Sequence, residues 1–455
     1  RPFFAAVVKA GMLIPMKRGR RAVEHWQNWS GWVKAAPQVV CRPGDEAELS
    51  QTIRQAEGPV RVAGAGHSFT PICETEGTLF SLENMSGLIA ADRAGSRAKI
   101  AAGASIRDLS PLLHSEGMAL ANQGDIDRQA IAGAVGTGTH GTGKDLQSLS
   151  GAVVGFRLVV PDGEVLICSP EENAEVFQAG RVAMGSLGIM SELELQCRPS
   201  YALEEKGGRL SVAELFRQLE KLRDENRHFE FFWFPFADDV LVKTLNEAEG
   251  EPKPRRRAPD GEASAGDIAF QRLCEVSRFA PFLRGRFQRQ MTEQGGARYS
   301  GDPSGRVRWS HDAFPSDRNV RFNEMEYAVP AQSGPDCVQE VADHMRSCGV
   351  NFLFPIEYRY VAADDIWLSP FFERDSVTIS VHQYHKQPYK KLFKGVEDIF
   401  RRYDGRPHWG KLHTLGAREL RDLYPRWDDF CRVRADLDPT ARMLNPFLKN
   451  LFGVS

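Results

Sequence analysis

The chain has 455 residues, with 58 Lys and Arg against 60 Asp and Glu, so its formal charge at pH 7 is −2. This length allows roughly two to four domains, each with a core of its own. Apolar residues make up 42% and charged residues 26%, which is the balance of a folded globular protein. A strong basic excess is typical of dedicated nucleic-acid binders, so we expect no nucleic-acid partner.

Two features bear on the cellular location. The eight cysteines lie far apart and form no CxxC pair, which favours reduced thiols in the cytoplasm and indicates no metal site. The first 21 residues contain two short apolar runs separated by Lys9, and neither run reaches the ~20 residues of a membrane-spanning helix. We expect a packed first helix there. The remnant of a targeting segment and a helix at a membrane surface are alternatives that we do not favour.

The first 199 residues alternate short β-rich runs, glycine-rich turns and helical segments, which is a mixed α and β pattern. Amphipathic patterns predict helices over 45–57 and 105–117. The dipeptide Asp162-Gly163 joins two β-branched runs and predicts a hairpin. Residues 191–199 alternate apolar and polar side chains and end at a proline, as a strand at a domain edge would.

From residue 201 to 407 glycine becomes rarer and longer units appear. The patterns predict helices over 211–226 and 335–348, and strands within 228–246, 321–330, 351–361 and 375–385. The aromatic residues between 229 and 236 are expected to pack in the core, with a substrate wall as the alternative. Residues 247–266 are rich in Pro, Gly and charge, so we expect an exposed loop.

Two glycine-rich loops stand out, at 62–69 and 133–143. Small residues allow backbone N–H groups to point into a concavity, which suits a diphosphate. The second loop contains a GxxxxGK pattern that ends at Lys144, but Asp145 follows where a nucleoside-triphosphate loop needs Ser or Thr. The first loop lacks the third glycine of GxGxxG. We therefore expect a different phosphate-binding architecture.

Six motifs occur in a recognisable order. They are AGAGHSFTP (63–71), GTGTHGTG (136–143), EMEYAVP (324–330), EYR (357–359), HWGKLHT (408–414) and DPTARMLNPFLKNLFG (438–453). Together they resemble the sugar-1,4-lactone oxidase and alditol oxidase branch of the vanillyl-alcohol oxidase family of FAD-linked oxidases. The resemblance implies an α+β fold with two domains: an FAD-binding domain formed by 1–199 and a C-terminal return at 408–455, and an antiparallel-sheet cap domain at 200–407.

The resemblance also implies how the cofactor is held. Main-chain amides of the two glycine-rich loops would bind the FAD diphosphate, and His67 would be bonded covalently to the flavin. The segment that contains Ile189 would run beside the adenosine part, and His140 would contact the flavin or order its loop. The residues assigned to the cofactor are Gly64, Ala65, Gly66, His67, Ser68, Gly133, Gly136, Thr137, Thr139, His140, Gly141, Ile189 and Lys411.

Four residues are candidates for catalysis. Glu357 and Arg359 are two apart on a predicted strand, so their side chains leave the same face, although surface strands also carry such pairs. By resemblance, Glu357 binds substrate hydroxyls, Arg359 stabilises negative charge, and Lys411 either lowers the pKa of the substrate hydroxyl or acts as the base. Strand alternation turns His382 to the same side as Ser380, so we expect it to line the pocket beside this pair. The alternative is that His382 and His385 form an exposed HxxH pair. A metal at His382 and His385 is not expected, because an HxxH pair converges on a helix and not on a strand.

The expected activity is the FAD-dependent transfer of a hydride from a CH–OH group to flavin N5, with O2 as acceptor and hydrogen peroxide as product. A polyol, sugar or aldonolactone is expected as the small, neutral, polyhydroxylated substrate. One alternative is a dehydrogenase that uses another acceptor, and a second is oxidation of a sugar hydroxyl in a larger substrate such as a nucleoside. A binding protein that has lost its chemistry is disfavoured, because Glu357, Arg359 and Lys411 are all present. Glu324 and Glu326 are expected to be structural ties beneath the pocket.

Overall fold

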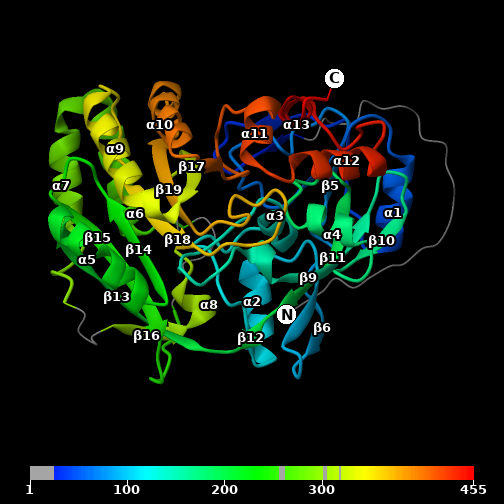
Figure 1. Cartoon of the computed structure of the whole chain (residues 1–455), viewed down its shortest axis with the longest axis horizontal. Coiled ribbons are helices and arrows are strands. Elements are labelled where there is room, and N and C mark those ends of the chain that lie inside the picture. Colours follow the sequence, from blue (N-terminus) through cyan, green and yellow to red (C-terminus); the bar gives the residue numbers. More distant parts are fainter. Residues whose placement is uncertain (1–24, 256–261, 301–304, 317–318, 455) are drawn as a thin grey trace, which may run out of the picture.

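The computed structural model describes residues 25–255, 262–300, 305–316 and 319–454. The first helix expected within residues 1–21, and the centre of the loop expected at 247–266, lie outside these ranges. Figure 1 shows two lobes side by side. We refer to the described residues up to 199 together with 408–454 as the first lobe, and to those from 200 to 407 as the second lobe.

The first lobe begins with a three-stranded parallel sheet in the order β3-β5-β4. Helix α1 links β3 to β4 and confirms the first predicted helix. The Asp45 carboxylate accepts a hydrogen bond from the Glu48 N–H at the start of α1, and Leu49 and Ile53 are buried one turn apart. The elements of this part are β1 (Trp26–Gln27), β2 (Lys34–Ala35), β3 (Val39–Cys41), α1 (Glu46–Gln55), β4 (Val60–Ala63) and β5 (Thr78–Ser81).

A five-stranded antiparallel sheet in the order β10-β9-β11-β7-β6 completes the first lobe. The predicted hairpin joins β9 to β10, and Gly163 in its turn has a φ of 86°, which glycine adopts without strain. The elements are β6 (Leu88–Asp92), β7 (Arg97–Ala101), α2 (Ile106–Ser115), β8 (Met118–Ala119), α3 (Ile131–Gly136), η1 (Leu149–Ala152), β9 (Val153–Val159), β10 (Val165–Cys168), α4 (Ala174–Gly180), β11 (Ile189–Gln196) and β12 (Arg198–Pro199).

The second lobe is built on an eight-stranded sheet in the order β16-β13-β15-β14-β18-β19-β17-β20, and every neighbouring pair is antiparallel. This confirms the expected antiparallel sheet. The strand predicted over 351–361 is shorter than expected, because β18 begins only at Ile356. The elements are β13 (Ala202–Ser211), α5 (Val212–Glu225), β14 (His228–Trp233), β15 (Asp239–Glu247), α6 (Ala265–Phe279), η2 (Pro281–Leu283), α7 (Arg284–Gln294), β16 (Arg306–Trp309), α8 (Ser310–Ala313), β17 (Phe322–Pro330), η3 (Ala331–Ser333), α9 (Gly334–Ser347), β18 (Ile356–Val361), β19 (Ser376–Tyr384), α10 (Lys390–Arg402) and β20 (Arg406–Pro407).

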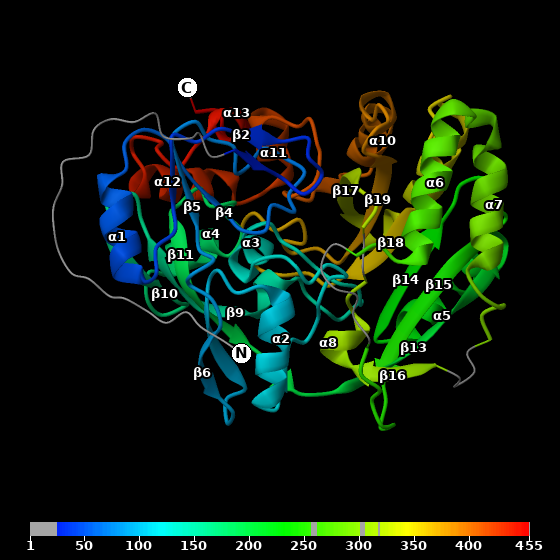
Figure 2. The same ribbon diagram turned by 180° about the vertical axis from the view of Figure 1, so that it is seen from behind.

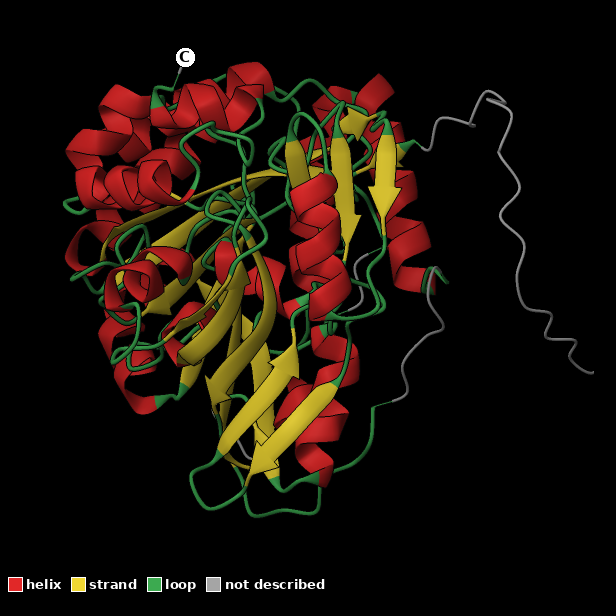
Figure 3. Cartoon of the chain, turned by 90° about the vertical axis from the view of Figure 1, so that its right-hand side faces the viewer, coloured by secondary structure: helices red, strands yellow, loops and turns green. Residues whose placement is uncertain are grey.

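The two faces of the large sheet carry different side chains, because successive residues of a strand point to opposite faces. On one face Tyr327 and Tyr358 join the apolar core with α9 and α10, and the Tyr327 hydroxyl donates to the Glu397 carboxylate at 2.5 Å. On the other face Glu326 and Glu357 line a cavity against the first lobe. Figure 3 shows the strands as broad arrows with the helices packed around them. Phe229 and Phe231 of β14 are buried, which confirms core packing for that strand.

The C-terminal helices α11 (Ala417–Leu423), α12 (Trp427–Leu437) and α13 (Pro446–Phe452) return to the first lobe, as Figures 1 and 2 show. The Val60 N–H donates to the Arg442 carbonyl at 2.8 Å, and the Asn445 side-chain amide donates to the Pro71 carbonyl at 2.7 Å. We propose domain boundaries at 199/200 and 407/408. All strands of the large sheet lie between these two boundaries, because β13 is its first strand in the sequence and β20 is its last.

Candidate active site

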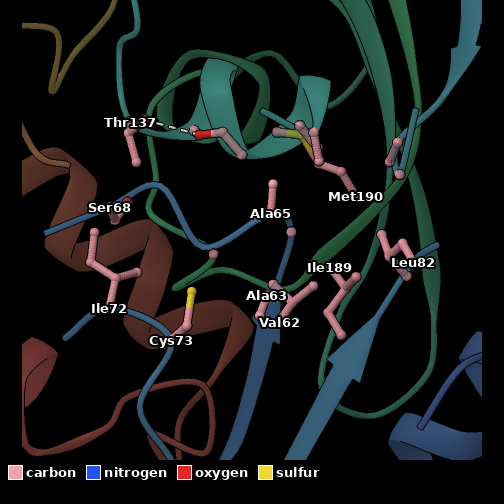
Figure 4. Close-up of a pocket in the computed structure, with 18 of the residues that line it drawn as sticks. Val62, Ala63, Ala65, Ser68, Ile72, Cys73, Leu82, Thr137, Ile189 and Met190 are labelled. Atoms are coloured by element: carbon pink, nitrogen blue, oxygen red, sulfur yellow. Dashed lines mark hydrogen bonds between the residues drawn. The ribbon is translucent and has the colours of Figure 1, made fainter. Parts of the chain in front are cut away.

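The first glycine-rich loop follows β4 and lines a long cavity between the two sheets of the first lobe. The cavity has a volume of ≈ 340 Å³, within the range of about 300 to 1,000 Å³ that is usual for ligand and cofactor sites. Figure 4 shows Val62, Ile72, Leu82 and Met190 around it. The residues assigned to the cofactor that line this cavity are Gly64, Ala65, Gly66, His67, Ser68, Gly133, Gly136, Thr137 and Ile189.

Glycine is required where the first glycine-rich loop meets the residue before α3. A Cβ on Gly64 would stand 2.8 Å from the Cβ of Ala130, so a larger residue would push these two segments apart. No atom lies within 4 Å of the place where a Cβ on Gly133 would stand, so a side chain there would enter the cavity itself. Main-chain groups at one side and apolar walls elsewhere suit a diphosphate that joins flat aromatic rings. The residues present therefore fit FAD.

A second, smaller cavity adjoins the first, and His67, Ser68, Gln129 and Thr137 line both. One wall comes from β17, β18 and β19 of the second lobe and from the segment after β20, and further walls come from the first lobe, including residues 124–126. The structure thus brings together residues that are far apart in the sequence. The four catalytic candidates Glu357, Arg359, His382 and Lys411 all line this cavity, as do Thr139 and His140.

Four residues assigned to the cofactor do not line the long cavity. Thr139, His140 and Lys411 line only the second cavity. Gly141 lines neither, and packing explains its glycine: a Cβ there would stand 2.2 Å from the Asn122 side-chain oxygen and 2.4 Å from the Gln123 carbonyl. Gly141 therefore allows the second glycine-rich loop to lie against the segment that carries Asn122 and Gln123.

Two carboxylates of β17 meet basic groups inside the second cavity. The Lys411 ammonium forms an ion pair with Glu324 and lies 4.0 Å from the Glu326 carboxylate, and His140 Nε2 lies 2.5 Å from Glu326 Oε1. Burial alone would raise the pKa of Glu324, but Lys411 and then His382 outweigh it and lower that pKa to about 2. Both carboxylates line the cavity, so the expectation that they lie beneath the pocket was wrong.

Arg359 is surrounded by three carboxylates. Its guanidinium lies 2.9 Å from Glu357, 2.9 Å from Asp125 and 2.7 Å from Glu230. Burial alone would lower the pKa of Arg359, but Asp125, Glu357 and Glu230 together hold that pKa well above its ordinary value. Because Asp125 belongs to the first lobe, this ion-pair cluster joins the two lobes at the cavity. His382 Nε2 lies beside it, 3.8 Å from Glu357 Oε1.

Asp125 and Glu230 are the residues of this cluster that the sequence analysis missed. Glu230 faces Arg359 across neighbouring strands, which becomes visible only when the pairing of β14 with β18 is known. Asp125 lies in the loop between β8 and α3, where no periodic pattern marks it.

His67 lies where the two cavities meet. Its ring stacks on Trp29 with centroids 5.9 Å apart. Burial first, then the charges of Lys411 and Arg128, lower the pKa of His67 to about 4. The imidazole is therefore neutral at pH 7 and keeps an unprotonated nitrogen.

Fold and site together define an FAD-dependent oxidoreductase of the vanillyl-alcohol oxidase type that acts on CH–OH donors. Residues 37–169 match a family model described as FAD binding domain, and residues 193–451 match the model of D-arabinono-1,4-lactone oxidase. The chain belongs to the D-arabinono-1,4-lactone oxidase family. This confirms the resemblance drawn from the six motifs, and with it the FAD cofactor.

Relatives match over nearly the whole chain. The chain is 38% identical over 435 residues to L-gulono-1,4-lactone dehydrogenase of Mycobacterium tuberculosis, which covers 94% of this chain and 99% of that protein. It is 30% identical over 450 residues to L-gulonolactone oxidase of Mus musculus, with coverage of 96% and 100%. Among solved structures, cholesterol oxidase from B. sterolicum matches with a TM-score of 0.80 at 17% identity, over 97% of this chain and 100% of that chain. At that identity the likeness concerns the fold alone.

Proposed function

We propose that this protein oxidises a CH–OH group of a 1,4-aldonolactone or a similar small, neutral, polyhydroxylated compound, with O2 as the electron acceptor. The observation that carries the proposal is the junction of two cavities at His67, one that fits FAD and one that holds Glu357, Arg359 and Lys411. The relatives are named for 1,4-lactone substrates, which supports this substrate class.

When bound, FAD supplies the hydride acceptor, and the chain must hold the substrate and help the hydroxyl release its proton to solvent water. Lys411 is the cation in the second cavity that can face the reacting hydroxyl. Glu324 stays ionised at neutral pH, because its pKa is about 2, and so keeps a fixed counter-charge beside Lys411. We propose that Lys411 lowers the pKa of the hydroxyl by stabilising its developing negative charge.

The remaining candidates position the substrate. The Glu357 carboxylate accepts hydrogen bonds from substrate hydroxyls, since ionised carboxylates are acceptors only. Arg359 holds Glu357 at 2.9 Å and is held in turn by Asp125 and Glu230, so its orientation is set on three sides. His382 lies 3.5 Å from Glu324 and 3.8 Å from Glu357 and keeps these two carboxylates apart.

We also propose that His67 is bonded covalently to the flavin. The neutral ring at the junction of the cavities, fixed by its stacking on Trp29, supports this assignment. A neutral imidazole nitrogen is a nucleophile, whereas a protonated ring is not.

The test is anaerobic bleaching of the purified protein with 1,4-aldonolactones, alditols and nucleosides. We expect a yellow protein that a lactone bleaches fastest, and a Glu357→Gln variant that stays yellow but bleaches at least about 100-fold more slowly. A colourless protein that takes up no FAD would overturn the proposal, and fastest bleaching by a nucleoside would favour the larger substrate. Admission of air after photoreduction identifies the acceptor. Rapid return of the colour with peroxide release supports O2, and slow return indicates a dehydrogenase.

A further inference from the structure

Helix α6 presents an apolar stripe to solvent at the edge of the second lobe. Ile268 and Val276 are 43% and 46% exposed, and Phe279 at the end of α6 and Phe282 in η2 are each 82% exposed. The spacing of 268, 276 and 279 places these side chains on one face of the helix. In Figure 2, α6 and α7 lie at the edge of the molecule farthest from α1.

This stripe differs from the other exposed apolar residues of the described chain. Those residues are scattered singly over the first lobe, which is usual for protein surfaces: Trp32, Val39, Ile89, Leu112 and Ile167. Four exposed apolar residues lie within one helix and the turn after it, and such clusters of exposed apolar residues mark interaction sites.

The opposite side of α6 is already packed. Phe270 stacks edge-on against Phe354 with centroids 4.8 Å apart, and Cys274 and Ser277 are buried. The Asn351 side-chain amide donates to the Ser277 carbonyl at 2.8 Å. Helix α6 therefore has two apolar faces. One packs against the rest of the second lobe, and the other, the stripe, faces solvent.

Basic residues surround the stripe. Residues 265–294 contain five arginines against three acidic residues, a local charge of +2 in a chain whose net charge is −2. Arg272 falls within the stripe, Arg278 lies 5.5 Å over the ring of Phe279, and Arg286 and Arg289 are exposed on α7. Two of the three acids are already engaged: Asp267 accepts from Ser264 and Asn319, and Glu275 accepts from Arg278 and Lys386.

We propose that the face formed by Ile268, Arg272, Val276, Phe279 and Phe282 docks on an anionic lipid surface. Aromatic and aliphatic side chains that protrude among arginines suit the boundary between acyl chains and phosphate head groups. A side chain that is 82% exposed stands clear of its neighbours and does not line a groove for a folded partner. Two copies of this positively charged face would repel each other, which argues against self-association. The contact is peripheral, since no helix among the described residues is long and apolar enough to cross a membrane.

The experiment is co-sedimentation of the full-length protein with vesicles of phosphatidylcholine that contain phosphatidylglycerol, compared with phosphatidylcholine alone. We expect binding to the anionic vesicles that weakens as salt is added. The double variant Phe279→Ser/Phe282→Ser should bind at least about tenfold more weakly, because it loses both protruding rings. The matched control Ile89→Ser/Ile167→Ser removes two exposed apolar residues of the first lobe and should bind like the wild type.

Equal binding by the wild type and the Phe279→Ser/Phe282→Ser variant would overturn the proposal, as would no binding to anionic vesicles. Gel filtration gives a further check: a wild-type dimer that this variant converts to a monomer would show that a second copy covers the face, and would also overturn it. The variant should keep its flavin absorbance and substrate bleaching, because these residues line neither cavity. A failure of lipid docking is therefore distinguishable from a failure of the proposed oxidation.

Discussion

Glu230 and Arg359 are direct partners across β14 and β18, and the Glu230 carboxylate accepts a hydrogen bond from Arg359 Nε at 2.7 Å. On its other side Glu230 is paired with Lys243 of β15, whose ammonium lies 3.3 Å away. The three residues form a row of alternating charge across three strands. This row leads from the interior of the sheet to Arg359 in the second cavity, so one carboxylate keeps two cations in place.

Removal of Glu230 should destabilise the protein. The variant Glu230→Ala removes a buried carboxylate that pairs with the buried Arg359 and with the half-buried Lys243, and breaking a buried ion pair costs about 3 to 5 kcal/mol. Urea unfolding measures the loss. The control Glu204→Ala disrupts the more exposed ion pair of Glu204 with Lys206 and should cost about 1 kcal/mol or less. If both variants lost the same small amount of unfolding free energy, the row of charges would not stabilise the sheet.

Replacement of Lys411 should separate flavin binding from chemistry. Lys411 lines the second cavity and not the long one, so Lys411→Met should keep the yellow colour. Its rate of anaerobic bleaching should fall by about 100- to 1,000-fold, the usual cost of losing a group that stabilises developing charge. The control Lys394→Met changes an exposed lysine of α10 and should bleach like the wild type. A normal rate in Lys411→Met would place the chemistry elsewhere.

Loss of His67 should release the flavin. After acid precipitation the wild-type colour should remain in the pellet, whereas His67→Ala should lose its colour to the supernatant, because no bond retains the cofactor. His385, which follows β19 and lines neither cavity, provides the control His385→Ala, which should behave like the wild type. Complete release of flavin from the wild type would contradict the covalent assignment.

Gly133 offers a test of the long cavity. Because no atom lies within 4 Å of a Cβ at this position, Gly133→Ala and Gly133→Leu should both fold. Alanine within α3 should be neutral or stabilise the helix by up to about 1 kcal/mol. The leucine side chain would occupy cofactor space. In the His67→Ala background, where no bond retains the flavin, we expect Gly133→Leu to lower FAD affinity at least about 100-fold, or about 2.7 kcal/mol. FAD titration monitored by fluorescence measures this, and unchanged affinity after the Gly133→Leu change would place FAD elsewhere.

Two buried histidines should make the stability depend on pH. Burial is the largest cause that lowers the pKa of His408 and of His413, each to about 4 from an ordinary value near 6.5. The folded state then binds fewer protons than the unfolded state between pH 6.5 and pH 4, so stability is greatest above pH 6.5 and falls as the pH drops. From pH 7 to pH 5 each ring should cost about 2 kcal/mol.

Urea unfolding at pH 7 and at pH 5 measures this loss. His413→Leu removes one of the two titrating rings and should reduce the difference between the two pH values by about half of the histidine contribution. An unchanged difference in His413→Leu would show that this ring is protonated in the folded state.

Local features were predictable because the forces that set them act within a few residues. The hairpin at Asp162-Gly163 formed where expected, and Glu357 and Arg359 share one face because a strand alternates. The order of the six motifs indicated the family before any contact was known. The assignment of Gly141 to the cofactor stays a prediction, and close packing against Asn122 and Gln123 also accounts for a glycine there.

By itself, the sequence determined the class of cofactor, through the resemblance of its six motifs to a known family. It also determined which residues share a strand face, because strand periodicity is written in consecutive residues. Only the tertiary structure decided which charges face one another. The pairs of Lys411 with Glu324, His140 with Glu326, and Arg359 with Asp125 join segments that are remote in the chain. Electrostatic energy depends on distance in space and on burial, and strand pairing and lobe contacts set both. The carboxylates first assigned beneath the pocket therefore proved to be part of its wall.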